Sequence, residues 1–138
     1  MERVMAHTQR IAAQCDYLLV EGAGGLMVPL GEGWFVRDLI SELLCDVIVV
    51  ARNTLGTINH TLLTAKCLEE KKIPRMRVVL MQPKNLDLSG KSNPGFLRRA
   101  LAPHPVQTIP FLGAAAHQRD GIMTAAKKLK KVLAALVD

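Results

Sequence analysis

Residues 20–30 of this 138-residue chain, with the sequence VEGAGGLMVPL, restrict its possible folds more than any other segment. The apolar run Tyr17–Val20 is typical of a buried strand in a parallel sheet. Glu21 ends this strand and opens into a loop of small residues, which is where α/β sheets bind ligands. The glycines allow backbone amides to approach an anion, and the carboxylate can reach a metal ion that the anion shares. On spacing alone, the alternative is an ordinary glycine turn with a solvated Glu21.

Helical and strand patterns alternate along the rest of the chain, which predicts parallel α/β layering. The predicted helices are 2–14, 36–44, 57–72, 93–101 and 120–137, and the predicted strands are 16–21, 46–51, 76–82 and 105–109. Residues 83–92, PKNLDLSGKS, have the composition of a mobile surface connection. Because no linker or internal repeat is present, we expect residues 1–138 to form a single α/β domain.

The formal net charge is +6, and much of the excess comes from Lys127, Lys128, Lys130 and Lys131 in the last predicted helix. The same helix carries an apolar stripe that we expect to face the core, formed by Ile122, Met123, Ala126, Leu129, Val132, Leu133 and Leu136. A solvated lysine face is favoured over a polyanion site, because no aromatic stacking platform or nucleic-acid motif accompanies it. We therefore expect no nucleic-acid partner.

The sequence also lacks the features of membrane, secreted and disulfide-rich proteins. It has no run of apolar residues long enough for a transmembrane helix, and its N-terminus lacks the apolar region of a secretory signal. Cys15, Cys45 and Cys67 are far apart and form no C-x-x-C pair, so they are expected to be small buried thiols. These features predict a cytoplasmic protein with no membrane partner.

A second motif, LGTINHTLLT at residues 55–64, follows the predicted strand 46–51. Together with VEGAGGLMVPL, it resembles the dethiobiotin synthetases, which are biotin-pathway ligases of the P-loop NTPase superfamily. The resemblance runs from residue 1 to about residue 113. VEGAGG also occurs in related P-loop amidoligases, whereas LGTINH is the more specific of the two motifs.

The resemblance implies an α/β fold with a parallel sheet flanked by helices. This would be a partial P-loop NTPase fold of the SIMIBI type without its N-terminal strands. The phosphate-binding pattern G-x-x-x-x-G-K-[ST] of that family does not occur in this sequence. The chain is therefore expected to be a fragment, the product of a mis-started reading frame or a natural remnant, and the sequence leaves these three explanations open.

Dethiobiotin synthetases use ATP and Mg²⁺ to carboxylate 7,8-diaminononanoate and close its ureido ring, with the metal bridging phosphate oxygens. By resemblance, Glu21 is a magnesium ligand, and the backbone of Gly22, Ala23 and Gly24 faces the nucleotide. The other metal ligands of the family lie in the part that this sequence lacks. ATP and Mg²⁺ are therefore expected to bind only together with that part, and no catalytic residue is expected in this chain.

Gly56, Thr57, Ile58 and Asn59 match the stretch with which the family binds the carboxylate of the diamine across a dimer interface. Thr57 is predicted to cap the helix that follows, leaving free amides that attract a carboxylate. The resemblance thus implies a diamino carboxylic acid as substrate and a homodimer or higher homo-oligomer. A capped helix start without a ligand is the alternative.

Two further segments match the adenine pocket of the family. The predicted strand 76–82 ends at Gln82, where the family usually has asparagine, and Pro83 follows; glutamine keeps the amide but adds a methylene. The base selectivity is therefore left open. Pro110, Phe111 and Leu112 resemble a proline-containing turn that lines the base pocket. An acidic residue often follows this turn in the family, but this chain has Ala114–His117 there.

Three functions remain open on the sequence. The chain could be part of an ATP-dependent dethiobiotin synthetase and inactive alone. It could be a dimerising or anion-binding module without catalysis. It could also be a related P-loop amidoligase. The motif VEGAGG fits that class, whereas the motif LGTINH fits it poorly.

Overall fold

The computed structural model describes residues 1–113, 116 and 118–137. The chain divides into two compact units. One comprises Met1–Asp46 with Lys66–Pro74, and the other comprises Val47–Ala65 with Arg75–Asp138. A single domain over residues 1–138 stays a prediction. No helix among the described residues is long and apolar enough to cross a membrane.

The second unit is built on a three-stranded parallel sheet with the order β3-β4-β5. Its strands are β3 (Val47–Arg52), β4 (Met76–Met81) and β5 (Val106–Ile109). β4 lies in the middle, and five of its six residues are buried, as expected for an apolar strand with neighbours on both sides. The predicted α/β class with a parallel sheet is confirmed.

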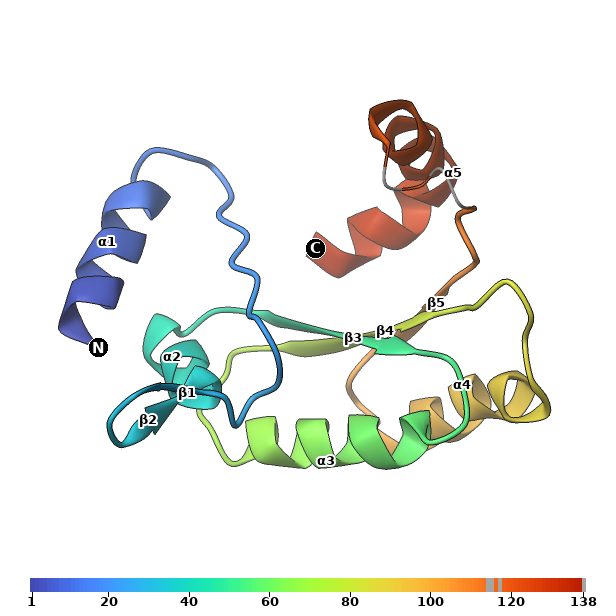
Figure 1. Ribbon diagram of the computed structural model, residues 1–138, viewed down its shortest axis with the longest axis horizontal. Coiled ribbons are helices and arrows are strands. Elements are labelled where there is room, and N and C mark those ends of the chain that lie inside the picture. Colours follow the sequence, from blue (N-terminus) through green and yellow to red (C-terminus); the bar gives the residue numbers. More distant parts are fainter. Residues whose placement is uncertain (114–115, 117, 138) are drawn as a thin grey trace. The chain divides into compact units, whose positions relative to one another are not determined.

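Helices flank this sheet on both faces, with α4 (Leu88–Ala100) on one face and α5 (Arg119–Val137) on the other (Figure 1). Leu129 and Leu136 of α5 form a core cluster with Val79 and Ile109 of the sheet. The buried stripe of α5 is narrower than predicted, because Ile122, Met123 and Leu133 are exposed, at 52%, 56% and 38%. The four lysines of the helix are exposed, as predicted.

α4 begins earlier than predicted, at Leu88, so the expectation of a mobile connection over 83–92 is wrong for its last five residues, 88–92. Asp87 is the N-cap, and its carboxylate accepts a hydrogen bond of 2.6 Å from the Gly90 amide. Such a cap satisfies an amide that the first helical turn leaves free. Gly90 and Pro94, which disfavour helix, concealed this start in the sequence.

The first unit contains α1 (Glu2–Ala12), an antiparallel pair of short strands β1 (Pro29–Gly31) and β2 (Trp34–Phe35), and α2 (Val36–Leu43). The predicted buried strand 16–21 is not formed, and Tyr17 and Leu19 are 82% and 87% exposed. An apolar run favours an extended backbone, but a strand also needs a neighbour for its ladder, and no described segment pairs with this one. Cys15 is exposed, so its predicted burial is also wrong.

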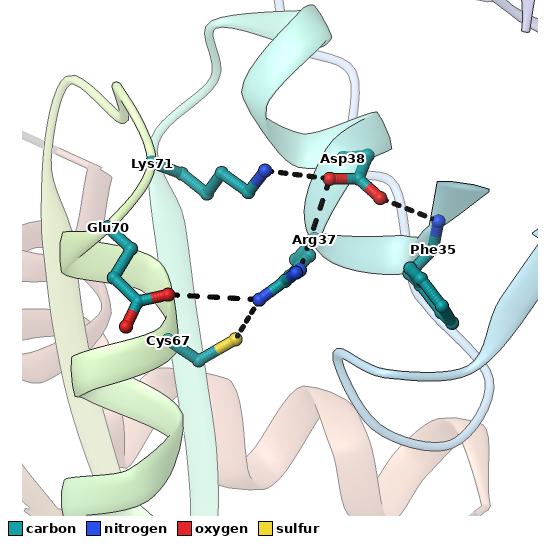
Figure 2. A network of polar contacts seen from close by, with 6 residues as sticks. All are labelled: Phe35, Arg37, Asp38, Cys67, Glu70 and Lys71. Atoms are coloured by element: carbon teal, nitrogen blue, oxygen red, sulfur yellow. Dashed lines mark hydrogen bonds and ion pairs between the residues drawn. The ribbon is translucent and has the colours of Figure 1, made fainter. Parts of the chain in front are cut away.

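A polar network joins the start of α2 to residues 67–71 within this first unit (Figure 2). Lys71 Nζ lies 2.8 Å from Asp38 Oδ1, and Arg37 Nη1 lies 3.7 Å from Cys67 Sγ and 3.8 Å from Glu70 Oε2. Asp38 also accepts the backbone amide of Phe35. The hydrogen bond from Lys71 is the largest cause of a lowered pKa for Asp38. These contacts fix the beginning of α2 after the β1–β2 turn.

Candidate functional site at the carboxyl edge of the sheet

The segments that follow β3, β4 and β5 lie at one edge of the sheet, because the strands are parallel. The Asn53 amide donates to the Met81 carbonyl oxygen at 2.9 Å, and the Gln82 amide donates to that of Ile109 at 2.8 Å. These bonds extend the sheet ladder just past the strand ends. Ligands of open α/β sheets bind at this carboxyl edge, so the segments after the strands form the candidate site.

The LGTINH segment forms the start of α3 (Thr57–Glu69) at this edge. The amide of His60 donates to the Gly56 carbonyl oxygen, and the amide of Thr57 donates to that of Thr54, both at 3.2 Å. Gly56 therefore occupies the cap position, one residue before the predicted cap at Thr57. Its φ of +91° lies in the left-handed region, where glycine is favoured. The amides of Ile58 and Asn59, between the two bonded ones, are those that a bound anion would meet.

A cavity of about 370 Å³ lies beside this helix start, between residues of β3 and one face of α3. Val49, Val50 and Leu55 supply apolar surface, and Thr57 and His60 supply polar groups. Of the described residues that line the cavity, none is acidic, and the basic one is Arg52. The cavity thus combines an apolar wall with a positive, hydrogen-bonding end, which suits a carboxylic acid with an aliphatic chain.

The side chain of Asn53 holds the loop between β3 and α3 in place. Asn53 is completely buried, and its Nδ2 donates to the Gly90 carbonyl oxygen at 2.8 Å. Asn93, which is also buried, donates from Nδ2 to Asn53 Oδ1 at 3.1 Å and to the Thr54 carbonyl oxygen at 3.2 Å. The loop is thereby bound to α4 through two buried amides whose hydrogen bonds are satisfied.

Pro94 explains why the Gly90 carbonyl is available to Asn53. In a helix, the N–H of residue 94 would bond the carbonyl of residue 90, but proline has no N–H. Asn53 supplies the missing donor from the neighbouring loop. A Cβ at Gly90 would lie 3.1 Å from the Asn53 backbone oxygen and would clash with Leu86, so glycine permits this close approach.

Asp87 adds a second connection between the same two segments. Its carboxylate accepts the Leu55 amide at 3.1 Å as well as the Gly90 amide and the Ser89 hydroxyl at 2.6 and 2.7 Å. The hydrogen bond from Ser89 is the largest cause of the lowered pKa of Asp87, followed by that from Gly90. Asp87, the N-cap of α4, therefore holds Leu55, the residue before Gly56.

The residues matched to the adenine pocket also lie at this edge. Gln82 and Pro83 follow β4 and are partly buried, and the segment Pro110–Leu112 follows β5. Phe111 is 48% exposed, and Leu112 packs against the core cluster. The structure thus brings Gln82, Pro83, Pro110, Phe111 and Leu112 to one side of the sheet. Their role in binding a base stays a prediction, and residues 114, 115 and 117 of the following stretch lie outside the described residues.

The Glu21 loop belongs to the first unit. Glu21 is exposed and is not preceded by a strand, and the exposed Gly22 leads into a bend at Ala23 and Gly24. Gly24 has a φ of +83°, and a Cβ there would lie 2.7 Å from Val28 Cγ2, so this turn requires glycine. In the part of the chain that the structure describes, no three His, Cys, Asp or Glu side chains could together hold a metal ion. A single carboxylate does not form a magnesium site, so Glu21 as a ligand stays a prediction.

Sequence reasoning missed Asn53, Asn93 and Asp87, which position the start of α3. The sequence D-L-S-G at residues 87–90 contains a recognisable N-cap signal that would have placed Asp87. Nothing local identifies Asn53 and Asn93 as partners, because they are forty residues apart.

Comparison with known protein families matches residues 1–120 to a family described as an AAA domain. The chain belongs to this AAA domain family. No solved structure matches it.

Three relatives are named ATP-dependent dethiobiotin synthetase. That of Thermodesulfovibrio yellowstonii is 40% identical over 121 residues, covering 81% of this chain and 50% of the relative. That of Bacillus subtilis is 39% identical over 114 residues, which cover 82% of this chain and 47% of the relative. That of Methanocaldococcus jannaschii is 43% identical over 79 residues, which cover 57% of this chain and 37% of the relative. The resemblance predicted from the two motifs is confirmed, and the chain spans about half the length of the first two relatives.

Because Asn53 replaces the donor that Pro94 lacks, we predict that substitutions of Asn53 and Pro94 have coupled effects on the free energy of unfolding. Asn53→Ala leaves a buried carbonyl without its donor, which should lower the free energy of unfolding by about 1–3 kcal/mol. In a Pro94→Ala background the helix supplies its own N–H to Gly90, so the same substitution should cost less. Urea denaturation of the two single variants and the double variant measures this coupling. Asn59→Ala, at an exposed position of α3, is the matched control. Equal costs of Asn53→Ala in both backgrounds would contradict the assignment.

The lowered pKa of Asp87 predicts a dependence of stability on pH. Because the folded-state pKa is below that of the unfolded chain, the ionised group stabilises the fold above the unfolded value of about 3.9. This contribution is lost as the pH falls through the folded-state pKa. The difference in unfolding midpoint between the wild type and Asp87→Asn should therefore be greatest near neutral pH and shrink below about pH 4. A difference that does not change with pH would show that the charge is not involved.

Proposed function

We propose that this chain supplies the carboxylate-binding portion of a dethiobiotin synthetase-like, ATP-dependent ligase. The observation that carries the proposal is the cavity of about 370 Å³ beside the start of α3, to which the LGTINH segment contributes Leu55, Thr57 and His60. The names of the relatives support the reaction class. On this proposal, a diamino carboxylic acid such as 7,8-diaminononanoate places its carboxylate at the amides of Ile58 and Asn59.

The physical basis is an anion at a helix N-terminus. The partial positive charge of the first turn and its free amides stabilise a carboxylate without a distant partner. Arg52 adds a full positive charge, and the apolar side chains of β3 accommodate an aliphatic chain. No acidic side chain among the described lining residues opposes the anion.

On this proposal, ATP and Mg²⁺ bind only to a site that is completed by the part of the family that this sequence lacks. When bound, they supply phosphoryl transfer to the carbamate of the diamine. Gln82, Pro83 and the segment Pro110–Leu112 would contact the base, and Glu21 with the backbone of Gly22–Gly24 would lie at the phosphate and metal. The donor set of the described residues does not suffice to hold the metal, so on this proposal the chain alone positions the substrate and does not transfer phosphate. A cytoplasmic location belongs to the same proposal.

We further propose that the protein forms homo-oligomers. Tyr17 and Leu19 in the first unit and Val50 of β3 in the second are apolar and are 82%, 87% and 66% exposed. β3 also lies at an edge of the described sheet, with one side of its backbone unpaired. Such surfaces favour association between chains.

The substrate site predicts weak carboxylate binding by the wild-type protein. Titration of the ¹⁵N-labelled protein with 7,8-diaminononanoate should shift the amides of residues 55–60, with a Kd of roughly millimolar because few contacts offset the cost of association. Gly56→Val should weaken binding at least about tenfold, because valine disfavours the positive φ that the turn requires.

Gly33→Val is the matched control for that titration. Gly33 also has a positive φ, of +76°, but lies in the β1–β2 turn of the first unit. The control should retain the shifts. Absence of shifts in the wild type at high ligand concentration would mean that the segment is only a helix start.

The proposal also predicts that the 138-residue chain alone has no ligase activity. Its described donor set does not form a magnesium site, and its sequence has no phosphate-binding pattern, so the electrostatic stabilisation of phosphoryl transfer is missing. The assay measures ATP-dependent formation of dethiobiotin from 7,8-diaminononanoate and bicarbonate with excess Mg²⁺. Steady turnover by the purified chain would refute this prediction.

Oligomer formation can be tested by light scattering at micromolar concentration. We expect a mass of at least two chains. Tyr17→Ser with Leu19→Ser should reduce association, because these substitutions remove exposed apolar surface. A monodisperse monomer in the wild type would contradict the proposed homo-oligomer.

A further inference from the structure

One side of β3 presents backbone groups that have no neighbouring strand in the described sheet. The amides of Val47 and Asn53 donate to the carbonyl oxygens of Arg75 and Met81, both at 2.9 Å, so these residues point their backbone groups toward β4. Successive residues of a strand alternate in this direction. The N–H and C=O groups of Ile48 and Val50 therefore point away from β4, toward the free edge.

This edge lacks the features that usually protect an edge strand. Natural edge strands are often very short, or carry proline or a charged residue within the strand. β3 has six residues, V-I-V-V-A-R, and its charged residue, Arg52, stands at its end. Ile48 and Val50 also expose apolar side chains. The edge of β3 is thus suited to receive a further strand.

Residues 17–20, with the sequence YLLV, are an apolar run in the first unit that has no partner. All four side chains are exposed, and the segment is paired with no strand among the described residues. Tyrosine and valine favour strands. Glu21 follows this run directly, just as Arg52 ends the apolar run of β3. The run and the edge therefore carry opposite charges at the same end.

These charges select one alignment of the two segments. If residues 17–21 were laid parallel to β3 with the two charges side by side, the exposed apolar side chains would also meet in pairs, because both segments alternate with the same period. The resulting pairs are Tyr17 with Ile48, Leu19 with Val50, and Glu21 with Arg52. A shift of two residues in either direction would separate the charges and place an apolar side chain beside one of them.

We propose that the free edge of β3 is a docking site for residues 17–20 of a second copy of this chain, which add to the sheet as a parallel strand. This inference rests on the homo-oligomer of the proposed function and names the surfaces that form it. The added strand bonds the backbone groups of Ile48 and Val50 and covers their side chains. A guanidinium has five N–H donors, so Arg52 can bond Glu21 of the second copy and still border the cavity beside α3.

Charge reversal tests the alignment. Glu21→Arg and Arg52→Glu, each alone, place like charges side by side and should weaken association at least about tenfold in sedimentation equilibrium. The double variant restores opposite charges and should return the dissociation constant to within about threefold of the wild type. Glu32→Arg, in the exposed turn between β1 and β2, changes the net charge as Glu21→Arg does. This matched control should leave the dissociation constant unchanged.

Amide hydrogen exchange, measured by NMR, tests the edge itself. The amides of Ile48 and Val50 should exchange more slowly in concentrated than in dilute protein, whereas those of Val47 and Asn53, which are bonded to β4 or just past its end, should be protected in both. Val50→Pro removes an amide that points outward and no bond to β4, so it should leave the sheet folded and weaken association at least about tenfold.

The outcomes separate this inference from the proposed homo-oligomer. Oligomers that respond to neither single charge reversal, or that the double variant does not restore, overturn this docking site alone. Protection of Ile48 and Val50 that does not change with concentration also overturns it, because the added strand would then come from the same chain. A monomeric wild type overturns both the docking site and the homo-oligomer.

Discussion

The hydrogen bond from the Asn53 side chain to the Gly90 carbonyl is the interaction on which the candidate site depends. Pro94 removes the donor that α4 would otherwise provide, and Asn53 replaces it at 2.8 Å from a buried position. Because Asn53 immediately follows β3, the bond fixes the direction in which the chain leaves the sheet. Asn93 completes the pair by bonding both Asn53 and the Thr54 backbone.

A fixed exit from β3 determines the geometry of the start of α3. Asp87 holds Leu55 from the side of α4, and Gly56 then turns through a positive φ into the helix. Thr57 and His60 of the first turn, the apolar residues of β3 and Arg52 thereby border one cavity. Without these contacts the loop would be ordered only when a ligand binds. The entropic cost of ordering it would then lower the affinity for the ligand. The contacts thus hold the segment in one conformation in the free protein, as the proposed carboxylate site requires.

The sequence predicted the strands of the sheet and the segment Leu55–Thr64 because their signals are local. The signals are apolar runs for β3 and β4 and a sequence motif for Leu55–Thr64. It failed where the outcome depends on a distant partner. Residues 17–20 have the pattern of a buried strand, but a ladder needs a neighbour that the pattern does not specify. The start of α4 at Leu88 was missed because Gly90 and Pro94 disfavour helix locally, whereas Asp87 and Asn53 stabilise it through tertiary hydrogen bonds.

The most direct test of the central claim, that the start of α3 is a preformed carboxylate receptor, is a crystal structure of the protein with 7,8-diaminononanoate. We expect the carboxylate to lie within hydrogen-bond distance of the amides of Ile58 and Asn59, with the aliphatic chain along β3. The bonds among Asn53, Gly90 and Asn93 should be unchanged from those of the free protein. A ligand whose carboxylate lies away from residues 55–60, or a rearranged loop between β3 and α3, would contradict the claim.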